Sequence, residues 1–142
     1  MTVLDAYAVI AYLGDEAAAS EVSRLLSAPC LLPLGNMAEV VDRLRRLQER
    51  STADILFALE ALERSGVSMA PTTFEGAFLA GVLRARHYHR ERCPVSLADC
   101  FTAATALRLR QPLATADPAL ADLCEDEGGD VIRLPDTDAR RP

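Results

Sequence analysis

The sequence predicts an α/β protein with a mostly parallel central sheet flanked by helices. Short apolar runs that suit buried strands alternate four or five times with longer segments in which apolar residues recur at helical spacing. The chain has 142 residues, half of them hydrophobic, which is enough to bury a substantial core. It shows no internal repeat and no linker, so we expect one domain over residues 1–134 and a flexible tail over 135–142.

The first elements lead from a short strand into helices. The β-rich run at 2–6 predicts a strand, and a short helix over 7–13 and an amphipathic helix over 16–27 follow it. The apolar run at 29–34 is bounded by prolines and predicts a buried strand. A helix over 36–48 comes next, because its apolar residues return every three or four positions.

Cap residues delimit the later helices. A helix over 51–66 begins after Ser51, a favoured N-cap. A longer helix over 72–92 opens with Thr72 and Glu75, which have the spacing of a capping box. The remaining elements are expected at 67–70 (strand), 96–109 (helix), 111–116 (strand), 117–128 (helix) and 130–134 (strand).

Composition excludes several kinds of protein. All 15 basic residues are arginines and the net charge is −6, which excludes a catalytic lysine and argues against a broad basic surface for nucleic acid. No run approaches the roughly 20 apolar residues of a membrane span, and the N-terminus lacks the basic region of a signal peptide. We therefore expect a cytoplasmic protein with no membrane contact. The four cysteines are scattered, and His87 and His89 are spaced poorly for a shared metal on a helix.

Four acidic residues fall where predicted strands give way to helices. Asp5 ends the first strand, and Glu39 lies in the first turn of the helix after the second. Asp99 opens its helix after a loop, and Asp117 directly follows the strand sequence LAT. Ligands of open parallel sheets bind beyond the carboxyl ends of the strands. The four carboxylates are therefore expected to meet at one site.

Helix capping is the alternative explanation for three of these acids. Asn36 with Glu39 and Ser96 with Asp99 have capping-box spacing, and Asp117 precedes a proline as an N-cap often does. Asp5 ends a strand and has no such explanation. Four like charges brought together would repel strongly at low dielectric, so a cation is expected among them. Oxygen ligands alone favour Mg²⁺ or Mn²⁺, shared by Asp5 and Asp99.

Four segments together resemble the PIN-domain ribonucleases, in particular the VapC-type toxins of toxin–antitoxin pairs. They are VLDAYAVIAYL, GNMAEVVDRL, VSLADCFTAATAL and LATADPALADL, in the family's order and spacing. The resemblance implies a PIN-like three-layer sandwich and a Mg²⁺- or Mn²⁺-dependent endoribonuclease. Its acidic residues correspond to Asp5, Glu39, Asp99 and Asp117. The polar residues that support them in the family correspond to Asn36, Ser96 and Thr115.

The resemblance also implies partners. Members of this family cleave RNA, form homodimers and are inhibited by a cognate VapB-like antitoxin, which carries the DNA-binding part of the complex. Arg43 and Arg46 follow Glu39 at helical spacing and either contact RNA phosphates or form ion pairs on a solvated face. The alternative function is a catalytically weak PIN module, a metal-stabilised partner for protein or RNA.

Overall fold

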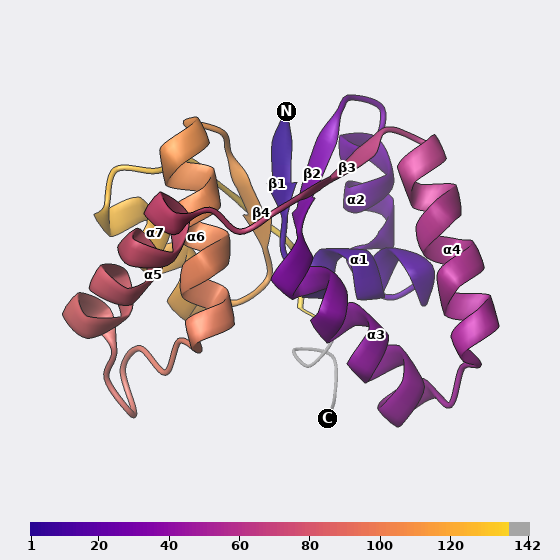
Figure 1. Ribbon diagram of the computed structural model, residues 1–142, viewed down its shortest axis with the longest axis horizontal. Coiled ribbons are helices and arrows are strands. Elements are labelled where there is room, and N and C mark those ends of the chain that lie inside the picture. Colours follow the sequence, from indigo (N-terminus) through magenta and orange to yellow (C-terminus); the bar gives the residue numbers. More distant parts are fainter. Residues whose placement is uncertain (137–142) are drawn as a thin grey trace.

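A five-stranded sheet, parallel throughout, forms the centre of the computed structural model, which describes residues 1–136 (Figure 1). The strand order is β3-β2-β1-β4-β5, so the first strand of the chain is also the middle strand of the sheet. The predicted α/β class is confirmed. Most of the tail expected at 135–142 lies outside the described residues. The strands are β1 (Thr2–Leu4), β2 (Cys30–Pro33), β3 (Val67–Ala70), β4 (Leu113–Thr115) and β5 (Val131–Arg133).

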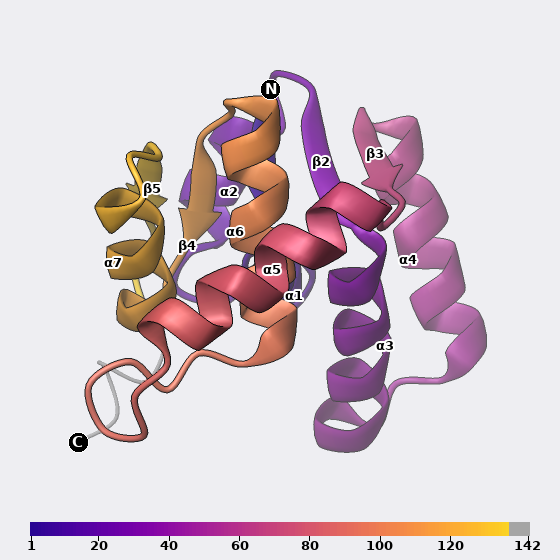
Figure 2. The ribbon, with the colours of Figure 1, turned by 60° about the vertical axis from the view of Figure 1, so that its left-hand side comes forward.

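Seven helices cover the two faces of the sheet within the described residues, which gives three layers. The first four helices lie on one face and the last three on the other, as Figures 1 and 2 show. They are α1 (Ala6–Leu13), α2 (Ala19–Leu25), α3 (Leu34–Gln48), α4 (Thr52–Arg64), α5 (Phe74–His87), α6 (Leu97–Leu109) and α7 (Pro118–Asp126).

The alternation of side chains along β1 explains why there are two cores. Successive residues of a strand point to opposite faces. Leu4 therefore joins the core beneath α1 to α4, together with Leu32 and Leu44. Val3 joins the core beneath α5 to α7, together with Leu113. All five side chains are fully buried, so the central strand is apolar on both sides, as expected for a parallel sheet covered by helices.

Several predicted boundaries are wrong, and local hydrogen bonds explain the differences. The helix expected at 72–92 begins two residues later, at Phe74, because Thr73, and not Thr72, is its N-cap and accepts the backbone N–H of Gly76. It ends at His87, beyond which His89 and Cys93 pair through two backbone hydrogen bonds. The helix expected at 16–27 is shorter, and the one expected at 36–48 starts earlier. No helix of the described part is both long enough and apolar enough to cross a membrane.

Substitutions of two glycines test the packing of the helical layer that contains α5 and α7. A Cβ at Gly129 would lie 2.7 Å from Cys124 Sγ and 3.0 Å from its carbonyl oxygen, whereas a Cβ at Gly81, inside α5, would meet nothing within 4 Å. Gly129→Ala should lower the free energy of unfolding by about 1–3 kcal/mol. Gly81→Ala should raise it by about 0.5–1 kcal/mol. Urea denaturation measures both, and equal stability of the two variants would contradict the packing described.

Candidate active site

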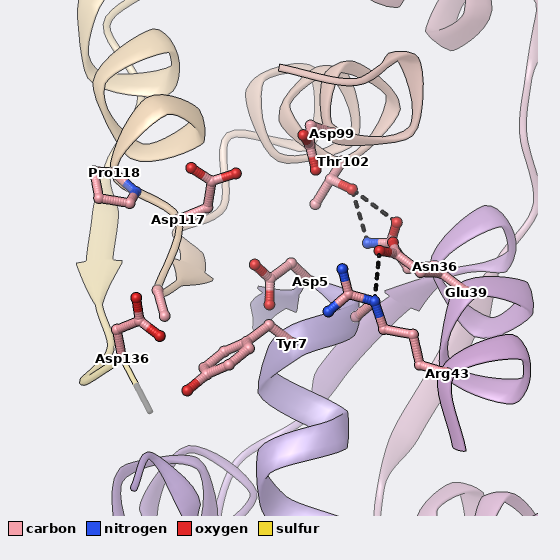
Figure 3. A pocket seen from close by; sticks show the side chains of 12 residues that line it. Asp5, Tyr7, Asn36, Glu39, Arg43, Asp99, Thr102, Asp117, Pro118 and Asp136 are labelled. Carbon is pink, nitrogen blue, oxygen red and sulfur yellow. Dashed lines mark hydrogen bonds and ion pairs between the residues drawn. The ribbon is translucent and has the colours of Figure 1, made fainter. Parts of the chain in front are cut away.

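The path of the chain opens a crevice next to β1. After β1 the chain enters α1 on one face of the sheet, and after the neighbouring β4 it enters α7 on the other face. The two helices diverge, and such a switch point is where open α/β sheets bind ligands. A cavity of about 300 Å³ lies there, and Asp5, Glu39, Asp99 and Asp117 all line it (Figure 3).

Asp5 is buried at the end of β1 and is fixed by two hydrogen bonds. Its Oδ1 accepts the backbone N–H of Ala8 at 2.8 Å, and its Oδ2 accepts the hydroxyl of Thr115. The expectation that Asp5 is not a helix cap is therefore wrong, because it is the N-cap of α1. Capping fixes the orientation of the carboxylate and leaves it at the floor of the cavity.

Thr115 connects Asp5 to Asp117. The same hydroxyl that donates to Asp5 accepts the backbone N–H of Asp117 at 3.0 Å. Asp117 is the N-cap of α7 as predicted, and its Oδ1 accepts the N–H groups of Ala119 at 2.9 Å and Leu120 at 3.4 Å. A single buried threonine thus sets the relative position of two carboxylates from neighbouring strands.

Asp99 is held by Ser96 in a capping box, as the spacing predicts. Ser96 Oγ accepts the N–H of Asp99 at 3.0 Å, and Asp99 Oδ2 accepts the N–H of Ser96 at 2.9 Å. Asp99 is half-buried and also lines the cavity. Asp99 can therefore cap its helix and also belong to the site, because the cap uses only one of its two carboxylate oxygens.

Glu39 and Arg43 form an ion pair at the other wall of the cavity. Arg43 Nε lies 3.5 Å from Glu39 Oε1, one turn away along α3, and Figure 3 shows the guanidinium directed toward the carboxylates. Arg46 does not share this position, because it pairs with Asp42 at 3.0 Å on the exposed side of α3. Of the two arginines considered in the sequence, Arg43 alone lines the cavity.

Asn36 has a different role from the one its spacing predicts. Helix α3 begins at Leu34 behind the extended residue Pro33, so Asn36 lies inside the helix and does not form a capping box with Glu39. Its buried amide contacts the hydroxyl of Thr102, with Nδ2 at 2.7 Å and Oδ1 at 3.0 Å from Oγ1. This contact joins α3 to α6 at the cavity.

Sequence reasoning missed three further residues that line the cavity. Thr102 was read only as part of an apolar helix, although its i and i+3 relation to Asp99 puts it on the same helix face. Tyr7 and Asp136 also line the cavity, and the Tyr7 hydroxyl donates to the Pro135 carbonyl at 3.4 Å. No spacing rule could have placed residues 135 and 136 beside the first helix.

Burial raises the pKa of three of the four carboxyl groups. The pKa of Asp5 rises to about 7, mainly through burial and further through the charges of Asp99 and Glu39, while the Thr115 hydroxyl and the Ala8 N–H oppose the rise. Burial also raises the pKa of Asp99 and of Glu39, and Arg43 opposes both shifts. The cavity therefore disfavours its own negative charge, which a bound cation would compensate.

The donor set suits a hard cation bound with water. All the candidate ligands are carboxylate oxygens, with no histidine or cysteine among the residues lining the cavity. Within residues 1–136, no three acidic, histidine or cysteine side chains converge closely enough to enclose an ion by themselves. Mg²⁺ commonly uses one or two carboxylates and keeps several waters, so this spacing fits an open, hydrated site.

The fold and the cavity define a class: an α/β protein with an acidic pocket at the switch point of a parallel sheet. Residues 2–126 match the PIN domain family model. The chain therefore belongs to the PIN domain family. A comparison with curated protein sequences gave no significant match.

Solved structures share the fold at low sequence identity. The VapBC2 complex of Rickettsia felis bound to a promoter DNA fragment matches with a TM-score of 0.70 and 11% identity, covering 94% of this chain and 98% of that chain. FitAcB from Neisseria gonorrhoeae matches with a TM-score of 0.66 and 19% identity, covering 94% and 97%. A toxin–antitoxin complex from Klebsiella pneumoniae matches with a TM-score of 0.64 and 17% identity, covering 85% and 90%.

The raised pKa of Asp5 predicts a dependence of stability on pH. The folded protein retains a proton on Asp5 between about pH 4 and 7 that the unfolded chain has lost, so the free energy of unfolding falls as pH rises through this range. Asn can keep the cap of α1 without the charge. In EDTA, Asp5→Asn should therefore stabilise the protein by roughly 2–4 kcal/mol more at pH 8 than at pH 4.

Thermal and urea denaturation at the two pH values, with Asp42→Asn as the control, measure this difference. Asp42 is exposed and paired with Arg46, and its pKa is lowered, so its substitution should give no such gain at pH 8. An Asp5→Asn effect of the same size at both pH values would contradict a buried, protonated carboxyl group.

Proposed function

We propose that this protein is a metal-dependent endoribonuclease that hydrolyses RNA phosphodiesters and acts as the toxin of a VapBC-type pair. The observation that carries the proposal is that four carboxylates, Asp5, Glu39, Asp99 and Asp117, line one cavity of a PIN-domain chain. PIN domains are typically nucleases. Three of the four acids have raised pKa values, so the cavity is arranged for a cation and not for helix stability alone.

Asp5 and Asp99 are the candidates for direct metal contact. Asp5 sits at the floor of the cavity and Asp99 at the start of α6, and Glu39 and Asp117 would act through bound water. A bound Mg²⁺ or Mn²⁺ would supply an activated water and neutralise the charge of the phosphate under attack. Hydrolysis of this kind would leave a 5′-phosphate and a 3′-hydroxyl, as the resemblance to PIN-domain ribonucleases implies.

The chain's own residues then position the substrate and the carboxylates. Thr115 and Ser96 hold Asp5 and Asp99 in fixed orientations, which keeps the ligands from rotating away when a phosphate approaches. Arg43 lies beside Glu39 with nearly half of its side chain exposed, so it can exchange that ion pair for a phosphate oxygen. The acidic cavity and this nearby arginine suit an RNA that is bound through cations and local arginines.

An antitoxin is the partner that we expect. The similar structures from Klebsiella pneumoniae and Rickettsia felis are a toxin–antitoxin complex and a VapBC complex, and the latter is bound to promoter DNA. An acidic cavity is complementary to a basic side chain of a VapB-like antitoxin, which would block the cation site. DNA would be contacted only through that antitoxin, and the protein would meet RNA in the cytoplasm.

The first prediction of this proposal concerns cleavage. Purified protein with Mn²⁺ should cut a mixed pool of small RNAs, and EDTA should stop the reaction. Asp5→Ala and Asp99→Asn should each reduce cleavage by roughly 100-fold or more, because each removes a charge that holds the cation. Asp42→Asn, on the same helix as Glu39 but outside the cavity, should cut like the parent.

Metal-dependent melting of the same preparations separates the two candidate functions. Millimolar Mn²⁺ should raise the melting temperature of the parent by mass action and leave that of Asp99→Asn nearly unchanged. A metal-dependent shift without cleavage of any RNA in the pool would favour the catalytically weak binding module. If Asp99→Asn is unfolded at every metal concentration, the residue is a structural cap and its assignment to the site is wrong.

We also expect a homodimer, with the first two turns of α5, around Phe74 and Phe78, as the contact. Phe74 and Phe78 lie one turn apart and are 82% and 69% exposed. The first turn of α5 also lines an apolar groove of about 210 Å³ with Phe101 and Leu109. A two-fold contact uses the same surface of both copies, so the exposed phenylalanines of one copy would pack against the groove of the other.

Sedimentation velocity tests the dimer. The double variant Phe74→Glu with Phe78→Glu should sediment as a monomer, because it places four charges in the contact of two copies. Phe57→Glu on α4, which is 70% exposed in the parent, is the matched control and should remain dimeric. Dimers of the double variant would show that the contact lies elsewhere, and monomers of the parent would refute the dimer itself.

A further inference from the structure

The segment between α5 and α6 holds a concentration of basic and aromatic residues that the carboxylate cavity does not use. Residues 84–92 contain four of the fifteen arginines and both histidines of a chain whose net charge is −6. Arg84 and Arg86 lie in the last turn of α5, and Arg90 and Arg92 lie in the loop that follows. A basic element on an acidic protein calls for a negatively charged ligand.

Short-range hydrogen bonds fix the shape of this loop. The ring of His89 accepts two backbone N–H groups through Nδ1, from Glu91 at 3.1 Å and from Arg92 at 3.0 Å. The backbones of His89 and Cys93 exchange two hydrogen bonds of 3.0 Å. The loop therefore holds its own conformation, and the HxH motif contributes through His89 without a metal.

Tyr88 is an exposed aromatic residue beside the loop, and an arginine lies over its ring. The guanidinium of Arg84 lies over its ring, 4.3 Å from the centroid, and Arg84 is itself held by a 3.2 Å hydrogen bond to the Val95 carbonyl. The Tyr88 side chain is nevertheless 46% exposed, and it borders an open hollow of about 330 Å³ with Leu97 and Gly81. An aromatic ring backed by arginine is a stacking surface for a nucleobase.

Arg90 and Arg92 are available for a ligand. Both are exposed, and neither forms an ion pair or a side-chain hydrogen bond with any residue between 1 and 136. Glu91, which lies between them, pairs with neither. This contrasts with Arg46, Arg86 and Arg133, whose guanidinium groups are taken up by neighbouring carboxylates.

The loop lies next to the Asp117 side of the cavity. Cys93 Sγ is 4.0 Å from the Ala119 carbonyl in the first turn of α7, two residues after Asp117. Three residues beyond Cys93, Ser96 caps the helix that carries Asp99. Figure 2 shows the loop at the end of the molecule where α6 and α7 both begin. An RNA strand that passes Arg43 and crosses the cavity would leave the cavity toward this loop.

We propose that Tyr88, Arg90 and Arg92 form a contact for single-stranded RNA outside the cleavage cavity. The exposed ring of Tyr88 stacks on a base, and the two arginines bind the adjoining phosphates. This inference rests on the proposed nuclease function and adds to it the contact that holds the flanking nucleotides. The combination of an exposed ring with unpaired arginines favours RNA over an acidic protein segment, because bases stack and carboxylates do not.

Fluorescence anisotropy with a labelled single-stranded RNA of twelve mixed nucleotides tests the contact, with Asp99→Asn as the background that prevents cleavage. Tyr88→Ala should weaken binding about tenfold, and Tyr88→Phe should bind like the background because the ring remains. Arg90→Ala with Arg92→Ala should reduce the slope of log affinity against log salt by about 1.4, as expected for two phosphates on a single strand. Arg64→Ala, an exposed arginine at the end of α4, is the matched control.

The outcomes separate this inference from the proposed function. If the background protein binds the RNA and the loop variants bind it equally well, the loop contact is wrong while the nuclease proposal stands. If the background binds no RNA while the parent cleaves it, the loop contact is wrong and the nuclease proposal stands; if in addition the parent cleaves no RNA, both proposals are wrong. A loss of binding in Tyr88→Phe as large as in Tyr88→Ala would show a structural role for the tyrosine and overturn base stacking. Loop variants that bind RNA normally but lose a protein partner would assign the loop to that partner.

Discussion

A carboxylate buried at the carboxyl end of the central strand is the constraint on which the rest of the site depends. Asp5 has almost no contact with solvent, and its pKa shows that ionisation there is unfavourable. The protein tolerates the group because one oxygen caps α1 and the other accepts from Thr115. Each of these bonds favours the ionised form, but together they do not offset burial. A bound cation would supply the stabilisation that these bonds do not.

The same constraint explains why capping and chemistry occur together here. Helix N-termini stabilise negative charge through their free N–H groups and their dipole. Three of the four cavity acids use this effect: Asp5 and Asp117 are N-caps, and Asp99 occupies the third position of its helix. Helix capping and ligand binding are therefore compatible at these residues. At Asp99 and Asp117 the cap uses one carboxylate oxygen and leaves the other available to a ligand.

The sequence predicted what depends on periodicity and order, and failed where long-range contacts decide. The strands, the helices and the gathering of four acids follow from apolar spacing and from the rule that parallel strands end at one edge. The contact of Asn36 with Thr102 joins residues 66 positions apart, which no local pattern encodes. The start of α3 was misplaced for a local reason, because extended Pro33 lets the helix begin at Leu34. The hydrogen bonds by which His89 shapes the 88–93 loop were not predicted, because an imidazole that accepts nearby backbone N–H groups has no characteristic spacing in the sequence.

The division of the carboxylates between the two helical layers has a mechanical consequence. Asp5 and Glu39 belong to the layer of α1 and α3, whereas Asp99 and Asp117 belong to the layer of α6 and α7. The separation of the two helical layers therefore sets the width of the cavity. The Asn36–Thr102 contact fixes that separation. A cation held from both sides would fix the layers at that separation. Binding of the cation would therefore also make the whole domain more rigid.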